Sequence, residues 1–165
     1  MLNQFYGAFA PLSFTVYGLW LIVVQTRHSE WRRSPDHRRR AYAVSLHFAL
    51  PGLMSLLALV DPTNSTVWRV SFAVSAAAGA IILGYLQFSP VPTPRGVLWQ
   101  IESTTSIILY GLIFLGAVAP GLARELGAPL RVEAVLLSLI VFLGINVAWA
   151  LMFDDVDDVK GVQGA

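Results

Sequence analysis

Apolar residues dominate five stretches of this chain, and short segments rich in polar residues, proline or arginine separate them. The apolar stretches cover residues 5–25, 41–60, 67–88, 97–119 and 134–153. Each is about 20 residues long, which at a rise of about 1.5 Å per helical residue matches a hydrocarbon core of about 30 Å. The pattern therefore predicts an all-α integral membrane protein, a bundle of five transmembrane helices forming one domain over residues 1–165.

Composition supports this class of protein. The chain is 56% apolar and 13% charged, with a mean hydropathy of +0.64, so a soluble domain could not cover its own surface with polar groups. It has no cysteine, which excludes disulfides and thiolate metal sites. We expect no cofactor, no metal site and no nucleic-acid partner, because no motif for any of them is present.

Arginine decides the expected orientation. Six arginines fall between Arg27 and Arg40, in the segment between the first two spans, and the positive-inside rule places that segment in the cytoplasm. The N-terminus is then outside and the C-terminus inside, with eight Lys and Arg residues on the cytoplasmic side against three outside. Ten of the eleven basic residues are arginine, a composition typical of GC-rich bacterial genomes, so we expect a multi-pass protein of a bacterial inner membrane.

Two local signals concern the third span. Asn64, Ser65 or Thr66 is expected to cap its helix, because such side chains accept hydrogen bonds from the first free N–H groups. Ser71, Ser75 and Gly79 lie four residues apart within this span, a pattern typical of close packing between membrane helices.

The fourth span contains polar residues that a lipid-facing helix would avoid. Its uninterrupted apolar run, residues 107–119, is about 20 Å long as a helix, so the span must include the polar residues before it. A charged residue at the centre of such a helix costs about 2.5–3.5 kcal/mol on insertion scales. Helical spacing places the following residues on one stripe, which we expect to face the bundle interior: Trp99, Glu102, Ser103, Ser106 and Tyr110.

Other spans carry polar residues at a similar depth. His47 and Asn146 each lie about 10 Å from the cytoplasmic end of their helix, at the level of Glu102. We therefore expect His47, Glu102 and Asn146 to form one polar layer inside the bundle, bordered by Gln87. Intramembrane ionisable groups are candidate functional sites. The alternative is that Glu102 interacts only with the helix dipole and water, while His47 and Asn146 are hydrogen-bonded packing residues.

The charged segments at the cytoplasmic side have simpler interpretations. The arginine cluster is a topology signal that also suits anionic lipid headgroups, and it comprises Arg32, Arg33, Arg38, Arg39 and Arg40. Residues 154–165 read as an acidic cytoplasmic tail, and their spacing matches no calcium-binding loop.

These observations favour a small membrane channel or transporter that passes an ion, a proton or a small polar solute along the polar layer. A non-transporting accessory, assembly or sensing subunit of a membrane complex is the alternative. A third class is an intramembrane enzyme that uses Glu102 and His47 as acid and base. It is less favoured than the other two, and we therefore assign no catalytic residues. The expected partners are the lipid bilayer and either further copies of the chain or another membrane protein.

Overall fold

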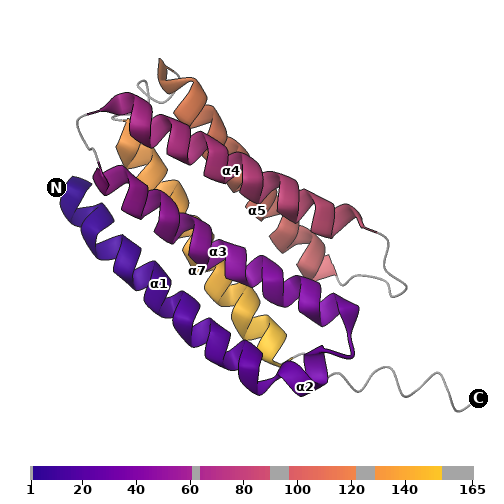
Figure 1. Ribbon diagram of the computed structural model, residues 1–165. Coiled ribbons are helices and arrows are strands. Elements are labelled where there is room, and N and C mark those ends of the chain that lie inside the picture. Colours follow the sequence, from indigo (N-terminus) through magenta and orange to yellow (C-terminus); the bar gives the residue numbers. More distant parts are fainter. Residues whose placement is uncertain (1, 61–63, 90–96, 122–128, 154–165) are drawn as a thin grey trace, which may run out of the picture.

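The computed structural model of the protein describes residues 2–60, 64–89, 97–121 and 129–153. Its long helices are α1 (Leu2–Thr26), α3 (Pro35–Val60), α4 (Ser65–Phe88), α5 (Val97–Val118) and α7 (Pro129–Phe153), and a short helix α2 (His28–Trp31) lies between α1 and α3 (Figure 1). Within the described residues, five helices are long and apolar enough to cross a membrane. The prediction of an all-α protein with five apolar helices is confirmed, and this architecture suits a multi-pass membrane protein.

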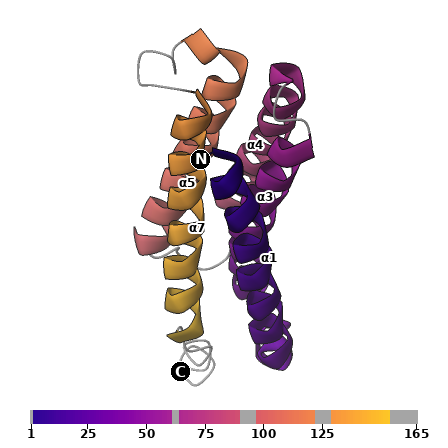
Figure 2. The ribbon, with the colours of Figure 1, turned by 90° about the vertical axis from the view of Figure 1, so that its left-hand side faces the viewer.

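Helix α3 is the centre of the bundle. It packs against α1, α4 and α7, while α5 packs against α4 and α7. Figure 2 shows α5 and α7 on one side of the molecule and α1, α3 and α4 on the other. The apolar window of α3 is 56% buried, against 33% or less in the other long helices. Polar residues of α3 are therefore the ones that most need partners inside the protein.

Helices α3 and α7 begin five or more residues earlier than the apolar pattern predicted. Helix α3 begins at Pro35, six residues before the expected start, because Ser34 accepts a hydrogen bond from the backbone N–H of His37 and proline suits the first helical position. The segment that we interpreted as one arginine-rich loop is thus largely helical. Helix α7 likewise begins at Pro129 rather than Ala134.

Helix α4 starts as expected. Asn64 is its N-cap, and the Asn64 side chain accepts a hydrogen bond of 3.0 Å from the backbone N–H of Thr66.

The stripe of small residues on α4 is a packing surface within this chain, because Ser75 and Gly79 are buried. A Cβ atom at Gly79 would lie 2.9 Å from the ring of Tyr110 on α5, so only glycine allows this close approach.

The outer surface of the bundle is apolar. Large exposed hydrophobic side chains are found on all five long helices, including Leu19, Leu56, Ile81, Ile108 and Phe142. Such a surface is stable against lipid, where apolar contact carries no penalty, and its backbone groups are satisfied within each helix. The acidic segment 154–165 lies outside the described residues.

Candidate functional site

His47 lies at the centre of the candidate site. It is buried on α3, and both of its ring nitrogens are within hydrogen-bond distance of oxygen atoms. Its Nδ1 atom lies 2.6 Å from the backbone carbonyl oxygen of Ala43, one turn earlier on α3. Its Nε2 atom lies 2.6 Å from the hydroxyl oxygen of Ser106 on α5. The same hydroxyl oxygen lies 2.8 Å from the carbonyl oxygen of Glu102, one turn earlier on α5.

The number of hydrogens in this chain of contacts restricts its states. A carbonyl oxygen only accepts, so Nδ1 of His47 must carry a hydrogen and donate it to Ala43. Ser106 has a single hydroxyl hydrogen, which points either to Glu102 or to Nε2 of His47. If it points to Glu102, the contact between His47 and Ser106 requires a second hydrogen, on Nε2. The direction of one hydroxyl group therefore follows the protonation of His47.

Large and small residues enclose His47. The ring of Tyr110 meets the imidazole edge-on, with a distance of 6.5 Å between the ring centroids. The Tyr110 hydroxyl donates a hydrogen bond of 3.1 Å to the carbonyl oxygen of Leu46. On the α7 side, Gly144 leaves space for the histidine, because a Cβ atom there would lie 2.6 Å from Cβ of His47. Three helices thus hold the imidazole in one position.

The polar stripe of α5 faces the bundle interior, as its spacing predicted. Trp99, Ser103, Ser106 and Tyr110 are buried, and Glu102 is half-buried. The hydroxyl of Ser103 donates to the carbonyl oxygen of Gln100 within the helix, at 3.3 Å. These positions bring His47 and α5 together, while the role of the stripe in transport stays a prediction.

Gln87 lies beside α5 at the Arg-rich end of the bundle, which is the end formed by α2 and the start of α3. Its side-chain amide donates a hydrogen bond of 3.0 Å to the hydroxyl of Thr104. Thr104 is exposed, whereas Ser103 and Ser106 are buried. Gln87 therefore contacts the outer side of the stripe and does not reach His47 through any contact of the described residues.

The expected inward orientation of Asn146 is wrong. Asn146 is exposed, and its side-chain amide donates a hydrogen bond of 2.7 Å to the carbonyl oxygen of Phe142 on its own helix. The rotation of α7 about its own axis explains this, because α7 turns Gly144 toward His47. Two further residues turn a helix of 3.6 residues per turn by about 200°, which places Asn146 on the far face. The polar layer therefore consists of residues from α3 and α5, without a side chain from α7.

Glu133 is a second buried ionisable group, and the apolar pattern of the sequence did not indicate it. Its side chain is 1% exposed, and among the described residues neither carboxyl oxygen has a hydrogen-bond partner. It lies in the second turn of α7, in contact with Gly116 of α5. One turn earlier, Tyr6 of α1 donates a hydrogen bond of 2.8 Å to the carbonyl oxygen of Leu130. Placing the start of α7 at Pro129 would have revealed Glu133 as an intramembrane residue.

Glu133 and His47 lie in different halves of the bundle. Eleven residues of α7 separate Glu133 from Gly144, the contact of His47, which corresponds to about 16 Å along the helix. A buried carboxyl group needs a proton or a cationic partner, because an unpaired charge is unstable in an apolar interior. Within the described part of the chain, no group of three or more His, Asp or Glu residues is arranged to hold a metal ion.

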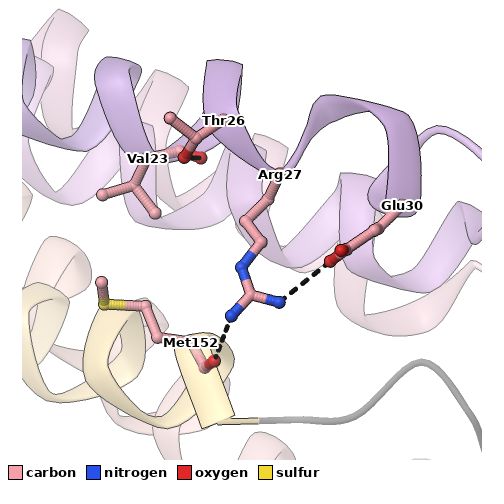
Figure 3. Close-up of polar contacts among 5 residues, drawn as sticks. All are labelled: Val23, Thr26, Arg27, Glu30 and Met152. Carbon is pink, nitrogen blue, oxygen red and sulfur yellow. Dashed lines mark hydrogen bonds and ion pairs between the residues drawn. The ribbon is translucent and has the colours of Figure 1, made fainter.

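The arginine cluster divides into several environments. Arg27 forms an ion pair of 2.9 Å with Glu30 and also donates to the carbonyl oxygen of Met152, near the end of α7 (Figure 3). Arg40 forms an ion pair of 2.8 Å with Asp36 and lies over the ring of Trp99. Arg27 thus links the start of α2 to the end of α7, where a cation also interacts favourably with the helix dipole. Arg40 links α3 to Trp99 of α5.

Comparison with known proteins adds no family or fold relative. The chain matches no protein-family model, no curated protein and no solved structure. The site itself therefore carries the functional argument.

Proposed function

We propose that the protein is a small membrane channel or transporter that moves protons, or a solute coupled to protons, past the His47 and Ser106 pair. The observation that carries this proposal is the shared hydroxyl hydrogen. Because Ser106 cannot donate to Glu102 and to His47 at once, gain or loss of a proton by His47 reverses the direction of the hydrogen bond that joins α3 to α5. A proton-dependent change at a helix contact is what a proton-coupled carrier requires.

The second buried ionisable group supports the same proposal. Glu133 lies about 16 Å from the level of His47, so the two groups would serve as proton-binding positions in opposite halves of the membrane. Tyr110 of α5 is a titratable side chain that faces His47. On α7, Gly144 contacts His47 and contributes no charge.

The orientation and location remain those expected from the arginines. The Arg-rich end would face the cytoplasm, which places the N-terminus outside, the C-terminus inside and Glu133 near the outer surface. The membrane would be the inner membrane of a bacterium. In this orientation His47 lies nearer the cytoplasm than Glu133 does.

The experiment is proton flux into liposomes that contain the purified protein and an internal pH-sensitive dye, started with a pH gradient. Ser106→Ala removes the shared hydrogen and should reduce flux at least ten-fold while the protein stays folded. Ser71→Ala is the matched control, because the Ser71 hydroxyl donates only to Val67 of its own helix. A wild-type protein without proton flux, in the presence and in the absence of added ions, would exclude a proton channel and proton-coupled transport of those ions.

An accessory subunit is the second candidate. It is favoured by the tight enclosure of His47 between Tyr110 and Gly144, which also suits a histidine that fixes helix packing. In this case Ser106→Ala would lower thermal stability or complex assembly and leave flux unchanged. Binding to further copies of the chain, or to another membrane protein, would then be the main activity.

A further inference from the structure

A cleft of about 210 Å³ opens at the Arg-rich end of the bundle, between the end of α1, helix α2 and the start of α3. Its lining comprises Val24, His28, Trp31, Arg32, Arg38, Ala41, Tyr42 and Ser45. The cleft combines basic side chains with apolar and aromatic walls. It is separate from the His47 site, since neither His47 nor Ser106 lines it.

The charge of this region is not balanced within it. Glu30 and Asp36 are the two acidic residues between Arg27 and Arg40, and both already form ion pairs, with Arg27 and Arg40 respectively. The Arg32 and Arg38 side chains are exposed and line the cleft, and neither has an ion-pair partner among the described residues. Two guanidinium groups at one cleft suit a phosphate group, because each offers a planar set of N–H donors.

The walls of the cleft indicate the source of that phosphate. Trp31 is buried and packs against Trp20, with 5.9 Å between the ring centroids, so this wall is rigid and apolar. Val24 of α1 and Tyr42 of α3 also line the cleft, at the end of two apolar spans, and the Tyr42 side chain is exposed. A free phosphate ion would gain nothing from these surfaces, whereas the glycerol and acyl chains of a lipid would bury them.

We propose that this cleft binds the headgroup of an anionic phospholipid, with the lipid phosphate between Arg32 and Arg38. A topology signal requires only positive charge at this end of the bundle. The cleft defines where a phosphate group would bind, because only two of the six arginines, Arg32 and Arg38, line it. This inference does not depend on proton transport, since an accessory subunit would use the same lipid site.

The test compares two double variants with the same change in charge. Arg32→Gln with Arg38→Gln removes the cleft arginines, and Arg33→Gln with Arg39→Gln removes neighbouring arginines that do not line the cleft. Native mass spectrometry of the detergent-purified protein would measure binding of phosphatidylglycerol and of phosphatidylcholine, and thermal melts would confirm that both variants are folded. If a double variant fails to fold, the single variants of the same residues replace it.

We expect the cleft variant to bind phosphatidylglycerol about ten- to thirty-fold more weakly than the wild type, because each arginine near an anionic surface contributes a factor of about five. Each single cleft variant should lose about five-fold. The neighbouring variant should bind like the wild type, and phosphatidylcholine binding should be the same for all.

Four results would overturn the proposal. Equal losses in the two double variants would mean diffuse electrostatic attraction, and equal binding of both lipids by the wild type would exclude headgroup recognition. Displacement of the lipid by millimolar inorganic phosphate would assign the cleft to a free anion. Selective lipid binding that appears only after removal of residues 154–165 would assign the cleft to the acidic end of the chain itself.

Discussion

The close approach of α3 and α7 at Gly144 provides the sharpest test of the site. In Gly144→Ala the new Cβ atom would lie 2.6 Å from Cβ of His47 and 3.0 Å from the ring of Phe48, whereas ordinary contacts begin near 3.4 Å. Cβ of His47 is fixed to the backbone and cannot turn away. The two helices must therefore separate by about 1 Å, which loosens the packing of α7 against His47.

Two opposing effects determine the magnitude. Overpacking of this kind costs about 1–3 kcal/mol, and replacing glycine by alanine within a helix returns about 0.5–1 kcal/mol. The net loss of about 0–2.5 kcal/mol corresponds to a melting temperature lower by up to about 10 °C for a chain of this size. Thermal unfolding in detergent, followed by tryptophan fluorescence, would measure it.

The matched control is Gly84→Ala on α4, where a Cβ atom would meet nothing within 4 Å. This variant should melt at the wild-type temperature or slightly above it, because only the gain in helix propensity remains. If Gly144→Ala melts together with Gly84→Ala, α3 and α7 do not pack this closely. The description of His47 as held between three helices would then be wrong.

Three further predictions concern the orientation in the membrane and the carboxyl groups of Glu102 and Glu133. Reporter fusions after Ala165 and within residues 122–128 should report opposite sides of the membrane, and a result placing both on the same side would refute the five-span topology. Glu102→Gln should change flux and its pH dependence while expression and melting temperature stay near wild type, whereas lost stability with unchanged flux would make Glu102 a structural residue. Glu133→Gln should keep or raise the melting temperature, because the amide removes the penalty of an unpaired buried charge. A melting temperature several degrees lower would reveal a partner that requires the carboxylate, and Glu30→Gln is the exposed control.

Sequence alone was sufficient for the five long helices and for the approximate level of the polar residues on α3 and α5. Helix length and depth depend on one local quantity, the rise of about 1.5 Å per residue, so counting residues from the end of an apolar stretch placed His47 at the level of Glu102, and the structure pairs His47 with Ser106, one turn further along α5. The inward stripe of α5 was also predictable, because its polar residues recur at helical spacing.

Only the tertiary structure decided which side chains point into the bundle on helices whose polar residues do not recur at helical spacing. In a water-soluble helix the polar face marks the outside, but a membrane helix is apolar on both its lipid-facing and its buried sides. The sequence of α7 therefore carried no signal for its rotation about its own axis. Contact between Gly144 and His47 sets that rotation, and it turns Asn146 outward. The start of α7 at Pro129 brings Glu133 into the helix, where contact with Gly116 buries a carboxyl group that the apolar pattern had left before the start of the span.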